Sequence, residues 1–149
     1  MLNTVVRQIA FHNFEFAFHS ARANGELSAD EIGKIWMETQ EQALGSAIMR
    51  DEAYSHLWAY IPHFVHTPFY VYAYAFGDCL VNALWQVYQS SDDRSGFVAH
   101  YKKLLADGGT KRYDTALAPL GLDAGDPAFW HKGLDMISAM IDELEETSQ

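Results

Sequence analysis

The sequence predicts an all-α protein, built as an array of several helices. Apolar side chains recur at three- and four-residue spacing in several long stretches, which is the period of an amphipathic helix. Residues typical of helix starts and ends flank these stretches. Neither an internal repeat nor a low-complexity linker interrupts the chain. Its 149 residues therefore predict a single helical unit over residues 1–149.

The first two helices have clear boundary signals. One covers about residues 3–24 and ends at Asn24-Gly25, because glycine readily adopts the left-handed conformation that follows a helix. The next begins at Ser28 and ends at Gly45. Ser28 and Glu31 have the spacing of a capping box, in which each residue satisfies the backbone N–H of the other.

Helical turns are also predicted over residues 51–60 and again from Thr67-Pro68 to about Gln89. The first of these ends before Ile61-Pro62, because the residue before a proline avoids the helical conformation. Thr67 and Pro68 are favoured at the start of a helix. The alternating tyrosines that follow also fit a strand, but a length of about twenty residues favours a helix. A helix with so few charges is normally buried within a larger body.

Three shorter signals organise the C-terminal part of the chain. A helix over about residues 95–106 ends at Gly108-Gly109, and a short helix is expected over residues 110–118. The last helix begins at Asp126-Pro127 and runs to about residue 146. Its acidic end opposes the helix dipole, which predicts an exposed terminus.

Composition excludes several classes of function. Ten basic and twenty acidic residues give a net charge of −10, which repels nucleic-acid phosphates and anionic lipid. We therefore expect no nucleic-acid partner and no membrane partner.

The N-terminus lacks the basic and apolar regions of a signal peptide. The single cysteine, Cys79, favours a reducing compartment and is expected to be a small buried hydrophobe. These features together predict a cytoplasmic protein.

Histidines and tyrosines concentrate in IPHFVHTPFYVYAY. His63 and His66 precede the predicted helix, and Tyr70 and Tyr74 lie four residues apart, so that they would share a helix face. Tyr72 would point about 200° away from Tyr70. Such groups at a helix start could bind a carbonyl oxygen or stabilise an oxyanion. Spacing alone favours the structural alternative, in which these are core aromatics whose hydroxyls reach the surface.

His12, Glu15 and His19 share one face of the first predicted helix. Imidazole and carboxylate groups bind zinc, but one helix rarely supplies three ligands in tetrahedral geometry. A solvated face or the edge of the core is the better interpretation. None of the seven histidines is followed by glutamate, so the H-E-x-x-H zinc motif is absent. We therefore expect no metal ligands in this chain.

The run WAYIPHFVHTPFYVYAYAFG, residues 58–77, resembles the C-terminal catalytic region of oligoendopeptidase F, in the M3 family of zinc metallo-oligopeptidases. The resemblance continues, in the same order along the chain, through VRQIAFHNFEFAFH, GELSADEIGKIW, YKKLLADGGTKR and LGLDAGDPAFWHKGLDMI. It covers nearly the whole chain. It implies that residues 1–149 form the C-terminal segment of a helical M3 catalytic domain.

This resemblance also implies roles for individual residues. In the family, zinc is held by H-E-x-x-H and a downstream glutamate, on helices that precede the matching region. The matching His63, Tyr70 and Tyr74 are then expected to act in catalysis, by binding the substrate carbonyl and stabilising the oxyanion. The same three residues, with His66 and Tyr72, are expected to bind the substrate.

The expected substrates are short peptides, and the expected partner is the H-E-x-x-H-bearing part of the peptidase. The chain alone is expected to hold no zinc and to be inactive, because the metal supplies both the nucleophile and the Lewis acid. Two alternatives remain open: a non-catalytic helical module that binds peptides, and a small metal-binding helical protein that uses the face of His12, Glu15 and His19.

Overall fold

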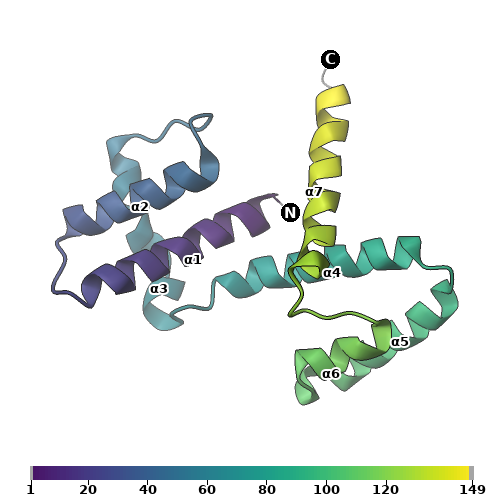
Figure 1. The fold of residues 1–149 in the computed structure, drawn as a ribbon. Helices are drawn as coiled ribbons and strands as arrows, with labels where there is room; N and C mark the ends of the chain where they lie inside the picture. Colours follow the sequence, from purple (N-terminus) through teal and green to yellow (C-terminus); the bar gives the residue numbers. More distant parts are fainter. Residues whose placement is uncertain (1, 148–149) are drawn as a thin grey trace. The chain divides into compact units, whose positions relative to one another are not determined.

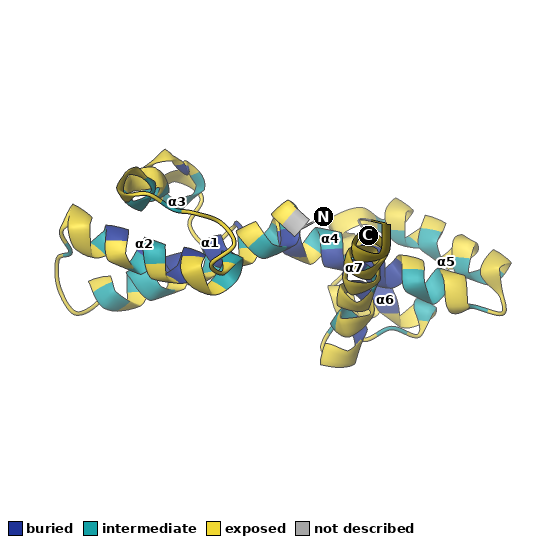
Figure 2. Cartoon of the chain, turned by 90° about the horizontal axis from the view of Figure 1, so that it is seen from above, coloured by how far each residue is buried: buried dark blue, intermediate teal, exposed yellow. Residues whose placement is uncertain are grey.

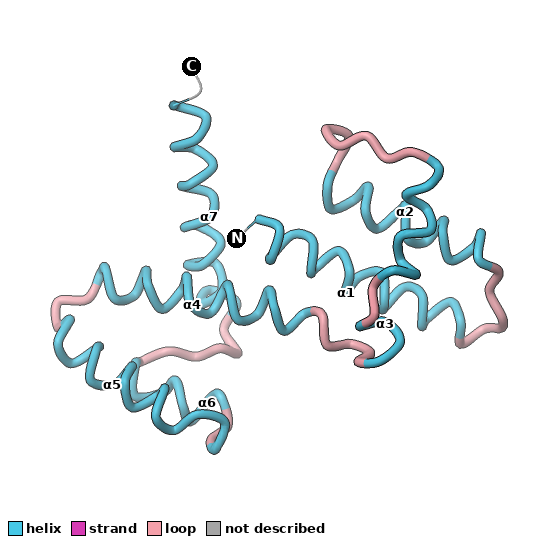
Figure 3. The backbone as a smooth tube through the Cα atoms, turned by 180° about the vertical axis from the view of Figure 1, so that it is seen from behind, coloured by secondary structure: helices cyan, strands magenta, loops and turns pink. Residues whose placement is uncertain are grey.

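The structure is a computed structural model that describes residues 2–147. Within that range the chain consists of α-helices, short 3-10 helices and loops, and no β-strand occurs (Figures 1 and 3). The all-α prediction is confirmed. Contacts within the chain define two compact units, Met1–Asp78 and Cys79–Gln149. The expectation that residues 1–149 act as one helical unit stays a prediction.

In the first unit, two long helices pack side by side. Helix α1 (Leu2–Arg22) lies against α2 (Ala29–Leu44), and the 3-10 helix η1 (Glu52–Tyr60) packs on α2 (Figure 1). The short helix α3 (His63–His66) and the start of α4 (Tyr72–Ser90) complete this unit. Helices α1 and α2 and the 3-10 helix η1 lie close to their predicted positions, whereas α3 was not predicted, because His63 and His66 were expected in a loop.

The boundaries of α2 follow from the side chains predicted to set them. The hydroxyl of Ser28 accepts a hydrogen bond from the Glu31 N–H at 3.3 Å, and the Glu31 carboxylate accepts one from the Ser28 N–H at 2.7 Å. At the other end, Gly45 has a φ of 64° and donates its N–H to the Glu41 carbonyl. Both the capping box and the glycine stop are confirmed.

Aromatic rings from α1 and α2 form the core of the first unit. The Phe14 ring meets the Trp36 ring edge-on at 5.1 Å, and the Phe11 ring lies 5.4 Å from Trp36. Trp36 is 1% exposed, and its indole N–H donates to the Tyr54 carbonyl at 3.0 Å. Val71, also 1% exposed, enters the same cluster from the segment before α4. Figure 2 shows buried segments of α1 and α2 in dark blue, between intermediate and exposed ones. The core therefore anchors the segment that carries the tyrosines.

The second unit contains the remainder of α4 and the elements after it. Their order matches the prediction, although the short helix over residues 110–118 is reduced to five residues at its centre. These elements are α5 (Arg94–Asp107), η2 (Gly108–Thr110), α6 (Tyr113–Leu117), η3 (Ala118–Leu120) and α7 (Pro127–Thr147).

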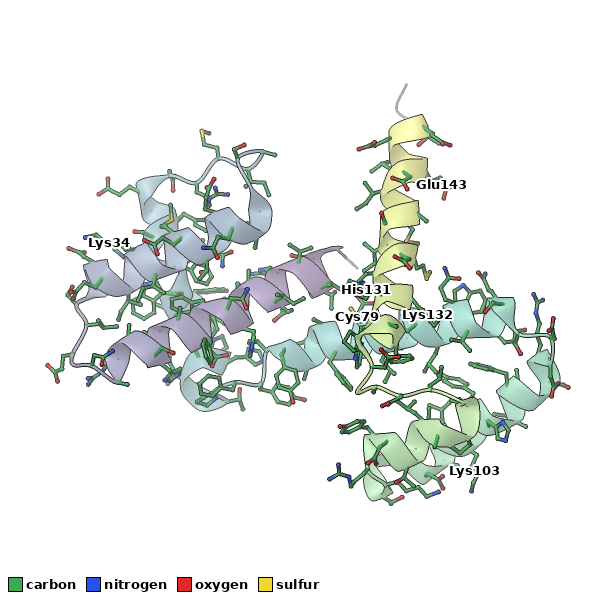
Figure 4. All side chains as sticks on the ribbon, viewed as in Figure 1. Lys34, Cys79, Lys103, His131, Lys132 and Glu143 are labelled. Carbon is green, nitrogen blue, oxygen red and sulfur yellow. The ribbon has the colours of Figure 1, made fainter. Side chains whose placement is uncertain are left out.

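Helices α4 and α7 cross at very short range in the second unit. A Cβ atom added at Gly133 of α7 would lie 2.6 Å from the Cys79 carbonyl oxygen of α4. Figure 4 shows Cys79 beside His131 and Lys132, at the first turns of α7. Cys79 is 7% exposed, as expected of a small buried hydrophobe. Glycine is therefore required at this crossing for steric reasons.

The predicted start of the tyrosine-bearing helix is wrong. Helix α4 begins at Tyr72, five residues after Thr67, and the preceding stretch is a loop (Figure 3). The Tyr70 N–H donates to the Thr67 carbonyl at 3.2 Å, Pro68 lies between them, and Phe69 has a φ of 59°. A proline followed by a residue with positive φ is typical of a type II turn. A left-handed residue cannot continue a right-handed helix, so Thr67-Pro68 begins a turn here.

Replacing Gly133 by alanine is expected to destabilise the chain by about 1–3 kcal/mol, because the added methyl group forces two helix backbones apart. Gly77→Ala is the matched control, since nothing lies within 4 Å of its Cβ position. Alanine there is expected to stabilise α4 by up to about 1 kcal/mol. Urea denaturation of both variants measures the difference, and equal stabilities would contradict the close crossing.

The pKa of the Glu31 carboxyl lies below its ordinary value of 4.5, chiefly because the Ser28 N–H donates a hydrogen bond to it. Because the pKa is lower in the folded state, the ionised carboxyl stabilises the fold above pH 4.5. This stabilisation is lost as the pH falls through the pKa of the folded state. Glu31→Gln keeps a capping side chain that does not titrate. The free energy of unfolding of the Glu31→Gln variant is expected to be lower than that of the original chain at neutral pH. In acid the two values are expected to be equal. A difference that is constant with pH, measured by thermal unfolding, would contradict this assignment.

Candidate functional site

A histidine and a tyrosine form a hydrogen-bonded pair on the surface of the first unit. His63 Nε2 lies 3.0 Å from the Tyr74 hydroxyl oxygen, and the two rings are nearly perpendicular. His63 begins α3, whereas Tyr74 belongs to the first turn of α4 and is 42% exposed. When Nε2 carries the imidazole proton it donates to the phenol oxygen, which leaves the tyrosine O–H to donate outward. The pair can therefore present a hydrogen-bond donor to a ligand.

Tyr70 extends this pair into a small polar and aromatic surface. Its ring meets the Tyr74 ring edge-on at 6.0 Å, and its side chain is 53% exposed. The prediction that Tyr70 and Tyr74 share a helix face is wrong, because Tyr70 lies before α4; the turn nevertheless brings the two rings next to each other. We refer to His63, Tyr70 and Tyr74 as the His–Tyr surface.

The two remaining candidates lie apart from this arrangement. Tyr72 is 51% exposed, and its ring meets the ring of His12 edge-on at 6.1 Å. His66 is exposed at the end of α3. His66 takes part in none of the contacts that define the His–Tyr surface in the described part of the chain. These two residues therefore flank the surface at most.

The face of α1 that carries His12, Glu15 and His19 supports the segment before α4. The Phe69 N–H donates to Glu15 Oε1 at 2.7 Å, and Glu15 is fully buried. The His19 ring lies 4.7 Å from the Phe69 ring. The face was expected to be solvated or at the edge of the core, and its centre proves to be buried beneath the turn. Helical spacing located this face, but no local signal identified the distant N–H that Glu15 accepts.

The residues that the structure describes form no zinc site. Within residues 2–147 no group of three histidine, cysteine, aspartate or glutamate side chains is placed to hold a metal ion, and this includes the α1 face. The sequence also lacks H-E-x-x-H. The structure thus gives no support to the small metal-binding protein considered above.

Within residues 2–147, no helix combines the length and the apolar character that a bilayer span requires.

An apolar pocket in the second unit was not anticipated from the sequence. It has a volume of about 210 Å³, and its lining includes Trp85 and Tyr88 of α4 and Phe97 and Tyr101 of α5. None of the residues expected to bind substrate lines it. The polar groups suited to a peptide carbonyl lie instead on the His–Tyr surface.

A comparison against protein families identifies the family to which the chain belongs. The sequence model of peptidase family M3 matches residues 2–136, and the chain belongs to this family. The resemblance recognised in its motifs is thereby confirmed.

Curated relatives refine this assignment. The chain is 29% identical to the plasmid-encoded oligoendopeptidase F of Lactococcus lactis subsp. cremoris, over 96% of this chain and 24% of that protein. It is 27% identical to an oligoendopeptidase F homolog of Borreliella burgdorferi, over 100% and 25% of the two chains. Oligopeptidase PepF of Bacillus subtilis is 28% identical, over 96% of this chain and 21% of its own length. The chain spans about a quarter of the length of these relatives. No solved structure matches it significantly.

Replacing Tyr74 by phenylalanine removes the hydrogen-bond partner of His63 Nε2. We expect the ring ¹⁵N resonances of His63 to move, because they report on tautomer and hydrogen bonding. The exposed His56 of η1 serves as an internal control whose resonances stay in place. Unchanged His63 resonances would show that the two side chains do not interact in solution.

Proposed function

We propose that this chain is the C-terminal segment of an oligoendopeptidase F-like zinc metalloendopeptidase that hydrolyses short peptides. In this proposal it provides the part of the active site that binds the substrate carbonyl and stabilises the oxyanion. The observation that carries the proposal is the 3.0 Å contact between His63 and Tyr74, with Tyr70 beside it, on the surface of a member of peptidase family M3.

The chemistry of these groups suits the proposed role. When a nucleophile attacks a peptide bond, the carbonyl oxygen gains negative charge, and donors aimed at it stabilise the transition state more than the substrate. The hydroxyls of Tyr70 and Tyr74 would act as these donors. His63 would donate a hydrogen bond to the Tyr74 hydroxyl oxygen and so hold it in position. The Tyr74 O–H would then donate to the substrate. Tyr72 and His66 would contact more distant parts of the peptide.

The nucleophile has to come from elsewhere in the enzyme. In the family a zinc ion bound to H-E-x-x-H activates the attacking water, and this chain does not contain the motif. We therefore propose that an H-E-x-x-H-bearing portion of an M3 peptidase is its partner. Exposed large apolar side chains on α4 support the proposal that another protein segment covers this helix. Phe76, Val81 and Trp85 are 39–57% exposed. A cytoplasmic location belongs to the same proposal.

A cleavage assay with a quenched short peptide and added zinc tests this function. We expect the purified chain alone to be inactive. We expect cleavage when it is mixed with the part of Bacillus subtilis PepF that lies outside the match, and loss of cleavage when a chelator is added. Chelator-sensitive cleavage by the chain alone, surviving repurification, would reveal a zinc site in this chain and would contradict the proposed division of roles.

The same mixture separates the roles of individual tyrosines. Tyr74→Phe is expected to lower kcat by roughly 100-fold, the usual cost of losing one oxyanion donor. Tyr60→Phe, at an 83% exposed tyrosine of η1, is the matched control and should leave kcat unchanged. Equal activities of the two variants would contradict the role of Tyr74. Peptide binding without cleavage in any mixture, lost on combining His63→Ala with Tyr70→Phe, would instead indicate the non-catalytic module.

A further inference from the structure

The turn before α4 contains a strained residue. Among the described residues, Phe69 is the one non-glycine residue with positive φ, at 59°. The left-handed conformation brings the Cβ atom close to the backbone, so that glycine or asparagine is normally found at this position of a type II turn. Phenylalanine has no such tolerance. Contacts elsewhere in the protein must therefore hold the turn in place.

The contact that does so comes from α1, 54 residues away in the sequence. The buried Glu15 carboxylate accepts the Phe69 N–H at 2.7 Å through Oε1. A hydrogen bond in a buried site is electrostatically stronger than one exposed to water. Among residues 2–147, the second oxygen of Glu15 is buried without a hydrogen-bond partner. The Phe69 N–H is thus the main stabilising contact of this carboxylate.

The turn decides where the next side chains go. Tyr70 follows Phe69 and is half-exposed beside Tyr74, whereas Val71 is 1% exposed in the aromatic core. If Phe69 returned to a common backbone conformation, the chain would leave the turn in another direction, and Tyr70 and Val71 could not both keep these positions. The position of Tyr70 within the His–Tyr surface therefore depends on Phe69.

We propose that Glu15 is a positioning residue for the His–Tyr surface. Its carboxylate holds the Phe69 N–H, keeps the turn in its strained conformation and places Tyr70 against Tyr74. Glu15 touches no substrate in this proposal, and its effect on peptide cleavage rests on the function proposed above. Its effect on the turn does not depend on that function.

Amide hydrogen exchange of the full chain tests the effect on the turn. The readout is the exchange rate of the Phe69 amide relative to that of Trp36, in the core of the same unit. We expect this ratio to rise roughly tenfold or more in Glu15→Ala and by a smaller factor in Glu15→Gln, which retains a neutral acceptor. Asn13→Ala, at an exposed position of α1, is the matched control and should leave the ratio unchanged.

The ratio separates a local role from a general loss of stability, which would accelerate both amides together. Should Glu15→Ala fail to fold, the ratio in Glu15→Gln decides. A ratio that stays at the original value in the folded variants would overturn the proposal. In the double variant that combines Glu15→Ala with Phe69→Gly, we expect the turn to form again, because glycine adopts positive φ without strain.

The peptidase mixture tests the consequence for activity. Glu15→Ala is expected to lower kcat at least tenfold, and Phe69→Gly in the same chain is expected to recover part of that loss. Full activity of Glu15→Ala, or no recovery with Phe69→Gly, would contradict a positioning role through the turn. If the unmodified chain gives no cleavage in the mixture, the proposed function fails, and hydrogen exchange alone decides whether Glu15 holds the turn.

Discussion

One hydrogen bond, from the Phe69 N–H to the buried Glu15 carboxylate, joins the helical core of the first unit to the segment that carries the tyrosines. The core supplies a rigid base, because aromatic rings from α1 and α2 interlock around Trp36. The strained turn at Phe69 then separates two neighbouring residues with opposite environments. Val71 enters the core, whereas Tyr70 stays exposed beside Tyr74. The polar surface thus depends on a contact made by a helix that precedes it by some fifty residues.

Local signals in the sequence predicted most of the helix boundaries, because the responsible contacts are local. The capping box of Ser28 and Glu31 and the glycine stop at Gly45 join residues three or four positions apart. Thr67-Pro68 is different, since the same two residues begin either a helix or a type II turn. The choice is made by Glu15, far away in the sequence, and phenylalanine gives no indication of a positive φ. A local pattern could not have resolved this ambiguity.

The candidate site shows the same division. Four-residue spacing predicted that Tyr70 and Tyr74 would share a helix face; Tyr70 lies before α4 instead, and a turn brings its ring beside that of Tyr74. Their concentration in one segment grouped His63 with these tyrosines, the resemblance to the M3 family suggested their roles, and the structure adds the contact of His63 with Tyr74. The role of Glu15 was missed because its helix face was considered as a metal site, a solvated face or the edge of the core, and none of these indicates a distant N–H as its partner. The proposed function places the nucleophile in another part of the peptidase, and the chain spans about a quarter of the length of its relatives.

The most direct test of this account is to map where a peptide binds. The chain, labelled with ¹³C in histidine and tyrosine rings, would be mixed with the H-E-x-x-H-bearing portion of PepF and zinc. A phosphinic peptide, which imitates the tetrahedral intermediate without being cleaved, would then be added. We expect the ring resonances of His63, Tyr70 and Tyr74 to shift, while those of Tyr88 and Tyr101 in the apolar pocket of the second unit do not. Shifts confined to that pocket, with the His–Tyr surface unchanged, would contradict it.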